Sequence, residues 1–418
     1  MSGGMMASCD GVRTEKRVVY FDNAATSWPK PREVGEAIAR FLAEDAANPG
    51  RSGHRMASSS AEMIERARSM LAELVRAPAH RMVLTHGCTD ALNIAIHGYL
   101  LAAHDSGSRF SRAHGEGAVP HVVSTMLEHK ACARPLSDLA DRGVIELDLV
   151  GCGEDGIVDP DEIFALVRDT TAIIAVTHAS NMVGTIQPVG EIGARIRREC
   201  PEVVFLVDGA QTVGVIPVDV EALGADFLAF PAHKGLLGPT GVGGLYVGER
   251  VYPEGHDGCS MRTCVQGGTG GGAPTMEMPR TLPGRFEAGT PNTIGLSGMI
   301  AALEHAPGSR IDHERACVGR IIEWADSVDG VRVVGTRDVS RRMGVVSLFF
   351  EDGRDPKGVA SELDERFGIA CRAGDHCATN AHVAMGTSPM GTLRFSAGPY
   401  TTDEDVETLL EALREIVG

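Results

Sequence analysis

Positive charge is scarce in this chain of 418 residues. Lys and Arg number 39 against 56 Asp and Glu, which gives a formal net charge of −17. A surface this acidic repels phosphate backbones and anionic lipid headgroups, and this disfavours nucleic-acid and membrane-surface binding. No apolar run approaches the roughly 20 residues that a membrane-spanning helix requires. We therefore expect a protein that binds neither nucleic acid nor membrane.

A disulfide framework and a secretory signal are also missing. The ten cysteines are scattered without paired spacing, so we expect free thiols. Residues 1–17 are small and polar and lack the apolar middle region of a secretory signal, which predicts a flexible tail. Together these features predict a cytoplasmic protein.

What the chain does have is an alternation of helical and strand patterns. Amphipathic or well-capped helices are expected over 31–46, 59–75 and 161–168, and short, fully apolar strands over 121–124, 172–176, 203–207 and 227–230. Strands of this kind are typical of a mostly parallel sheet covered by helices on both faces. In such α/β folds ligands bind beyond the carboxyl ends of the strands, so the residues that follow each strand are the candidates for a site.

A second block follows an irregular stretch rich in Gly and Pro, residues 267–283. From about residue 294 the chain has a strand pattern of its own over 344–350 and a terminal helix after Thr402. We expect this block to form a smaller C-terminal domain, because a chain of this length has room for two to three domains.

Two charged residues follow predicted strands. Asp208 comes directly after 203–207, where a carboxylate is either a helix N-cap or the partner of a cationic ring nitrogen in a bound cofactor. Lys234 comes shortly after 227–230 and before an apolar, Gly-rich turn. Such a lysine is usually a surface residue, but desolvation here would favour the neutral amine that condenses with an aldehyde.

Other strand ends carry polar groups as well. A glycine turn opens a helix at Cys88 and Thr89, where backbone N–H groups form a cup for a phosphate. His129 follows 121–124 and is either a satisfied core residue or a ring that stacks on a flat cofactor; Asn181 ends a polar cluster after 172–176. An amine, a carboxylate and an anion cup on one sheet are the parts that a pyridoxal phosphate site requires.

At this point the sequence resembles the class V aminotransferase superfamily, and within it the cysteine desulfurase and selenocysteine lyase branch. The stretches that carry the resemblance lie at 20–26, 48–57, 177–185, 207–212, 230–241, 286–293 and 371–378. The resemblance implies the pyridoxal-phosphate-dependent transferase fold type I. It also implies a large domain over 34–294 with a mostly parallel seven-stranded sheet, and a small α+β domain formed by 18–33 with 295–418.

The resemblance further implies a role for each of a set of residues around pyridoxal 5′-phosphate. Lys234 carries the cofactor covalently, Asp208 pairs the pyridinium nitrogen, Gln211 bonds the phenolic oxygen and His129 stacks on the ring. The phosphate is held by Cys88, Thr89 and His233, and by Thr290 from the neighbouring subunit, which implies a homodimer. The substrate carboxylate binds Asn181 and Arg394, with Arg372 in the same pocket. No metal is implied.

Cys377 separates a desulfurase from a transaminase. On count alone it is one free thiol among ten, but 372–378 resembles the nucleophile loop of the short-loop desulfurases. Arg372 and His376 are expected to supply positive potential that favours a thiolate. The implied reaction converts L-cysteine to L-alanine and leaves a persulfide on Cys377. A sulfur-acceptor protein then takes the sulfur for iron–sulfur clusters or another thio-cofactor.

Three alternatives stay open: a selenocysteine lyase, a class V aminotransferase or lyase acting on another amino acid, and a cofactor-binding protein without turnover. The chain also departs from the family pattern. Pro231 replaces a common serine, Cys88 a common hydroxyl residue, and Lys130 a common second histidine after His129. Segments 104–119 and 251–265 are longer than is usual in the family. They are either partner-facing loops or plain surface insertions.

Two further patterns are rejected as sites. The glycines of 151–156 match a dinucleotide fingerprint, but acidic residues stand where a pyrophosphate would lie. The spacing of Cys371, His376, Cys377 and His382 fits no common zinc pattern.

Overall fold

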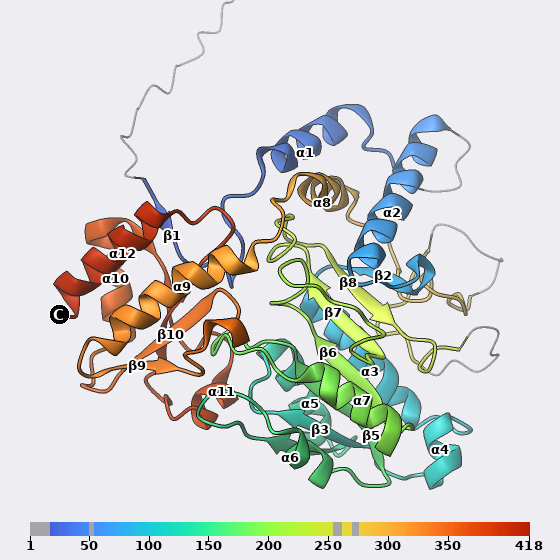
Figure 1. The fold of residues 1–418 in the computed structure, drawn as a ribbon. Coiled ribbons are helices and arrows are strands. Elements are labelled where there is room, and N and C mark those ends of the chain that lie inside the picture. The colour runs from blue at the N-terminus through green and yellow to red at the C-terminus, as the bar shows by residue number, and fades with distance from the viewer. Residues whose placement is uncertain (1–16, 50–53, 254–260, 270–275) are drawn as a thin grey trace, which may run out of the picture.

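The computed structural model describes residues 17–49, 54–253, 261–269 and 276–418. Its largest element is a seven-stranded sheet in the order β2-β8-β7-β6-β5-β3-β4 (Figure 1). The strands are β2 (Met82–Thr85), β3 (His121–Thr125), β4 (Glu146–Val150), β5 (Thr171–Thr177), β6 (Val204–Asp208), β7 (Phe227–Pro231) and β8 (Gly243–Val247). In this sheet β8 runs antiparallel to both neighbours, and the other pairs are parallel. The predicted mostly parallel seven-stranded sheet is confirmed.

Alternate residues of the central strands pack into two separate apolar cores, one on each face of the sheet. Along β5, Ile174 and Val176 lie in one core and Ile173 and Ala175 in the other. Helices α3 (Cys88–Ala103) and α5 (Lys130–Asp141) cover the second of these faces. The first face is covered by α2 (Arg55–Leu74), α6 (Pro160–Ala165), α7 (Val189–Glu199) and α8 (Thr293–His305). Strands buried on both faces need apolar side chains at every position, which is the pattern that the sequence shows.

The helix starts follow their capping residues. α6 begins as predicted, because Asp159 accepts a hydrogen bond from the backbone N–H of Asp161 and Pro160 occupies the first turn. α1 spans Arg32–Glu44, close to the predicted 31–46. α2 begins four residues before the predicted start because the His54 side chain accepts from the Ala57 N–H. Histidine is not among the usual N-cap residues, so the pattern did not indicate it.

The C-terminal domain has its own sheet, in the order β12-β13-β10-β9 and antiparallel throughout. Its elements are α9 (Ile311–Asp326), β9 (Val331–Val334), β10 (Val345–Phe350), α10 (Pro356–Phe367), β11 (Ile369–Ala370), β12 (Arg372–Gly374), α11 (Thr379–Ala384), β13 (Thr392–Ser396) and α12 (Asp403–Ile416). β1 (Val19–Tyr20) pairs with β11, so the start of the described chain joins this domain (Figure 1). The short helical turns η1 (Ala79–Arg81) and η2 (Val339–Arg341) and helix α4 (Arg109–His114) complete the fold.

The division into domains is refined by the position of α8. Its residues Leu296, Met299 and Ile300 pack in the core of the large sheet. We therefore propose that the boundary lies between α8 and α9 rather than at residue 294. Of the two longer segments, 104–119 contains α4, whereas part of 251–265 lies outside the described residues. None of the helices in the described ranges is apolar over enough residues to span a bilayer.

Candidate active site

A cavity of about 630 Å³ lies where the carboxyl ends of the parallel strands meet the C-terminal domain. With one exception, Thr290, it is lined by every residue that the sequence predicts for the site. These are Cys88, Thr89, His129, Asn181, Asp208, Gln211, His233, Lys234, Arg372, Cys377 and Arg394. Residues from seven segments far apart in the sequence therefore converge on one space.

Asp208 is the last residue of β6 and is 3% exposed. Its Oδ1 accepts a hydrogen bond from the backbone N–H of Ala210 at 2.9 Å and one from the Cys88 thiol at 3.4 Å. Burial, and then the charge of Asp208, raise the pKa of Cys88 well above its usual value, so Cys88 remains a thiol donor. These donors account for a carboxylate at a buried strand end.

Lys234 lies three residues beyond β7, in the Gly-rich turn. Burial lowers its pKa, Asp208 opposes this effect, and Arg394 and Arg372 add to it. A lowered pKa favours the neutral, nucleophilic amine that the sequence predicts. The turn is anchored from the N-terminal segment, because the carbonyl oxygen of His233 accepts from the backbone N–H of Ser27 at 2.9 Å.

The first turn of α3 presents unpaired backbone donors to the same cavity. Its N-cap is Gly87, with φ of 141°, a conformation that residues with a side chain rarely adopt. The N–H groups of the first helical residues, Cys88 and Thr89, have no partner four residues back. His233 adds a buried Nδ1 that has no hydrogen-bond partner in the described part of the chain. Burial lowers the pKa of His233 to about 4, so its ring is neutral.

His129 is the N-cap of α5, which fixes its ring at the cavity wall. Its Nδ1 accepts from the backbone N–H of Ala131 at 3.0 Å, so in the neutral ring the proton is on Nε2. Burial, and then Lys234, lower the pKa of His129 to about 4. A neutral, flat ring is suited to stacking on an aromatic ligand.

Two arginines lie opposite each other in the pairing of β12 with β13, Arg372 and Arg394. Arg394 is 1% exposed; its Nη2 donates to Asp22 Oδ1 at 2.5 Å and its Nη1 to the Asn181 carbonyl at 3.0 Å. Its Nε has no partner among the described residues. Asp22 neutralises one of the two positive charges of Arg372 and Arg394. The other charge remains to bind an anion such as a carboxylate. The sequence motif contained Asp22 but assigned it no role.

Gln211 and Asn181 complete the polar wall. Gln211 donates from Nε2 to the carbonyl oxygen of Ala24 at 3.1 Å, and Asn181 donates from Nδ2 to that of His376 at 2.7 Å. Each amide nitrogen has two hydrogens, so each keeps one donor for a ligand.

Cys377 sits in a tight turn from Asp375 to Ala378, closed by a hydrogen bond from the Ala378 N–H to the Asp375 carbonyl at 2.9 Å. His376 and Cys377 both have positive φ, 51° and 56°. The expectation that His376 supplies positive charge is wrong. Burial lowers the pKa of His376 to about 2, and its Nε2 lies 2.9 Å from the Thr392 hydroxyl, so the ring is neutral. Arg372 alone of the two expected cations remains.

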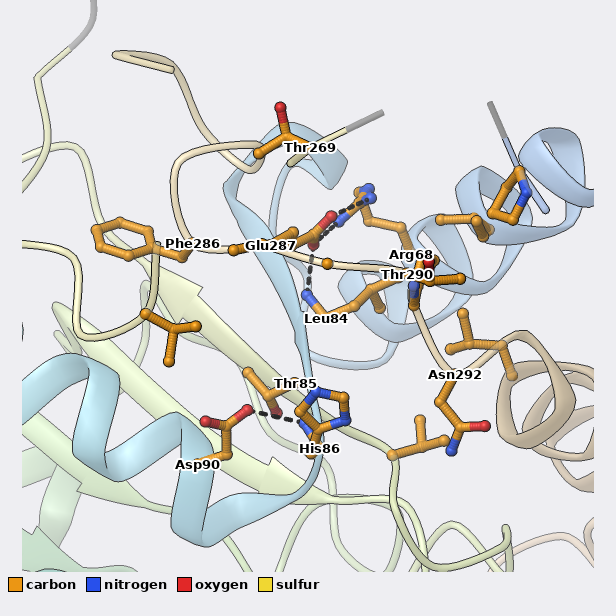
Figure 2. A pocket seen from close by; sticks show the side chains of 18 of the residues that line it. Arg68, Leu84, Thr85, His86, Asp90, Thr269, Phe286, Glu287, Thr290 and Asn292 are labelled. Carbon is orange, nitrogen blue, oxygen red and sulfur yellow. Dashed lines mark hydrogen bonds and ion pairs between the residues drawn. The ribbon is translucent and has the colours of Figure 1, made fainter. Parts of the chain in front are cut away.

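Thr290 lies apart, in a second cavity of about 910 Å³ (Figure 2). Figure 2 shows Arg68 paired with Glu287, which also accepts from the Leu84 N–H at 2.7 Å. The two cavities share His86, Asp90 and Gly241 in their walls, so they adjoin. Within one chain, however, Thr290 is not brought to the other predicted residues.

The rejected patterns can also be placed. In the glycine-rich 151–156 segment, the N–H of Gly153 donates to Ile157 and that of Gly156 to Gly153, which forms a turn before α6. Among the described residues, no group of three or more His, Cys, Asp or Glu side chains is arranged to hold a metal ion.

The fold agrees with what comparison with known proteins finds. The model of the aminotransferase class-V family matches residues 19–409, and the chain belongs to this family. Among curated relatives, a probable cysteine desulfurase of Methanothermobacter thermautotrophicus is 35% identical, with 96% of this chain and 95% of the relative covered. A cysteine desulfurase of Salmonella newport is 32% identical, with 96% and 93% covered.

Solved structures give the same result. The apo structure of a cysteine desulfurase from Thermococcus onnurineus matches with a TM-score of 0.84 at 32% identity, covering 96% of this chain and 94% of that one. The cysteine desulfurase CsdA of Escherichia coli, in an S-sulfonic acid form, matches with a TM-score of 0.78 at 28% identity, covering 95% and 94%. The predicted family and fold type I are confirmed.

Proposed function

We propose that this protein is a pyridoxal-phosphate-dependent cysteine desulfurase that forms a persulfide on Cys377. The observation that carries the proposal is that Lys234, Asp208 and Cys377 line one cavity. A transaminase or a different lyase needs the first two residues but has no use for the thiol. The relatives named cysteine desulfurase support the same activity.

The residues present fit the cofactor. Lys234 offers an amine with a lowered pKa for its aldehyde, and the buried Asp208 carboxylate suits a pyridinium nitrogen. Thr89, Cys88 and the unpaired Nδ1 of His233 offer donors to its phosphate, and Gln211 to its phenolic oxygen. When bound, the cofactor withdraws electrons from the substrate's Cα and so makes the proton there acidic.

The protein's own groups then divide the remaining work. Arg394, Arg372 and the free amide hydrogen of Asn181 bind the substrate carboxylate and so orient the amino acid. The Lys234 amine, once free, accepts the proton from Cα. Asp208 would pair the ring nitrogen of the cofactor, and the neutral ring of His129 would stack on its face.

Sulfur transfer is assigned to Cys377. Its thiolate attacks the substrate Sγ, an S–S bond forms, and the Cβ–Sγ bond breaks with its electron pair going to carbon. Cβ takes up a proton and Lys234 returns its proton to Cα, so L-cysteine and a thiol become L-alanine and a persulfide without any external oxidant or reductant.

The test replaces Cys377 by Ser in the cofactor-loaded protein and measures alanine, sulfide and keto acid from L-cysteine and L-selenocysteine. We expect alanine formation from cysteine to fall by at least about 100-fold, since a nucleophile is lost, while cofactor content stays the same. Undiminished desulfuration would remove Cys377 from the mechanism. For the wild-type protein, keto acid as the main product would indicate an aminotransferase. Turnover of L-selenocysteine but not of L-cysteine by the wild-type protein would indicate a selenocysteine lyase.

We propose a homodimer in which Thr290 reaches the phosphate of the other subunit, since within one chain it lies in the adjoining cavity. A sulfur-acceptor protein then takes the persulfide sulfur. The eight cysteines in the described ranges are free thiols, which supports the proposed cytoplasmic location.

A further inference from the structure

The turn that carries Cys377 has an unfavourable backbone conformation. Two successive residues with side chains, His376 and Cys377, have φ of 51° and 56°. A left-handed conformation is energetically unfavourable for such residues. Strained backbone persists only where the surrounding contacts over-determine it, so the contacts that hold this turn matter for where the thiol lies.

Lys130, from the large domain, contacts the turn at two points. Its backbone N–H donates to the carbonyl oxygen of Cys377 at 2.8 Å, and its Nζ donates to Asp375 Oδ2 at 2.6 Å. The other carboxylate oxygen, Asp375 Oδ1, accepts from the Thr379 hydroxyl at 2.7 Å. The turn is therefore held on both sides of the nucleophile by one residue of the other domain.

The position of Lys130 is not explained by its own helix. It is the first residue of α5, where the positive end of the helix dipole disfavours a cation. The charge of Asp375 offsets this cost, and the Lys130 hydrogen bond helps to hold the pKa of Asp375 below its usual value. The two side chains are 28% and 45% exposed, so the pair adds little to overall stability. What distinguishes this pair is its position: Lys130 lies next to His129 in the chain, and Asp375 lies two residues before Cys377.

We propose that Lys130 and Asp375 are positioning residues that fix the Cys377 turn relative to the cofactor half of the site. The proposal rests on the proposed role of Cys377 as sulfur acceptor. Loss of the pair should leave Arg394, Arg372 and Gln211 in place, because among the described residues neither Lys130 nor Asp375 forms a side-chain hydrogen bond with them. It lets the thiol move away from the substrate sulfur.

The test uses Lys130→Met, Asp375→Asn and the double variant in the cofactor-loaded enzyme. Lys130→Met keeps the backbone N–H bond to Cys377 and removes only the ion pair. We expect each single variant to lower the single-turnover rate of alanine formation about 10-fold, since a misplacement of about 1 Å costs up to ~100-fold. The KM for cysteine should change less than about two-fold, and the double variant should be no worse than either single one. Lys130→Arg should restore most of the rate.

Two comparisons separate the possible outcomes. Asp155→Asn breaks another pair between the domains, Arg341 with Asp155 at 3.9 Å, and is the matched control that should keep the wild-type rate. Wild-type rates for both single variants, or rates lowered only in step with protein unfolding, would overturn the proposal. Cys377→Ser, measured alongside, tests the proposed function separately. If it is inactive while Lys130→Met is fully active, the positioning proposal alone is wrong.

Discussion

The two halves of the site are built in different ways. Asp208 ends one strand of the large sheet, and Lys234 and Cys88 follow two others; strands that run in the same direction bring their carboxyl ends to the same edge. Arg372, Cys377 and Arg394 come from an antiparallel sheet and a strained turn, held by contacts with Lys130 and Asn181. Hence the residues of the first half are positioned by the direction of the strands in one sheet, and those of the second half by contacts between the domains. Changes in the two halves should have different effects.

The largest effect is expected in the cofactor half. Replacing Lys234 by Ala or Arg should lower cysteine turnover by at least about 1,000-fold, since both the covalent attachment and the proton acceptor are lost. Arginine keeps the charge but stays protonated, so it cannot substitute for the amine. The measurements are the turnover rate, and borohydride reduction followed by peptide mapping. Turnover close to wild type in Lys234→Arg would contradict the assignment.

A smaller effect is expected from the substrate-binding part of the second half. Arg394→Lys should lower kcat/KM for cysteine by about 10- to 100-fold, since a hydrogen bond to a charged group contributes about 1.5–3 kcal/mol. The Asp22 carboxylate would keep one partner, and the planar fork would be lost. Cofactor content, measured from absorbance, should remain at the wild-type level. A loss of cofactor instead would mean that the two halves are not separable.

The same contrast explains how much the sequence could predict. Strands β3, β5, β6 and β7 were predictable because residues buried on both faces must be mostly apolar, and Asp208 and Lys234 followed from where those strands end, whereas β4 and β8 were not predicted from the pattern. The neutral state of His376 and the contacts of Lys130 were not predictable, because they depend on residues 16 and 245 positions away. The role of Cys377 came from the resemblance, since nothing in its local pattern distinguishes it from nine other thiols.

Glu128 follows β3 in the large domain, and its burial predicts a pH effect on stability. It is 2% exposed, and its Oε1 accepts from the Thr177 N–H at 2.7 Å. Burial, and then Asp208, raise the pKa of Glu128 from 4.5 to about 8. The folded state therefore holds a proton that the unfolded state releases, so this contribution is greatest below about pH 4.5 and is lost as pH rises towards 8.

Glu128→Gln should remove this pH dependence. Between pH 5 and 8.5 the wild-type protein should lose at least about 1.4 kcal/mol more free energy of unfolding than the variant, which is one pH unit for one proton. Urea unfolding at both pH values measures the difference. Parallel pH profiles for the two proteins would show that Glu128 does not hold the proton.

The smallest effect is expected far from the turn, within the C-terminal domain. Thr402 caps α12 in a capping box with Asp405. Thr402→Ala should lower the free energy of unfolding by about 1 kcal/mol and leave cysteine turnover unchanged. A drop in turnover at full stability would show that the nucleophile half responds to distant changes in its domain.

The central claim is that the sulfur leaves cysteine for Cys377. The most direct test mixes the cofactor-loaded wild-type protein with one equivalent of L-cysteine, alkylates it, and maps the peptides by mass spectrometry. The account predicts that the Cys377 peptide gains one sulfur atom for each alanine released. Alanine release with an unmodified Cys377, or sulfur found on a different cysteine, would contradict it.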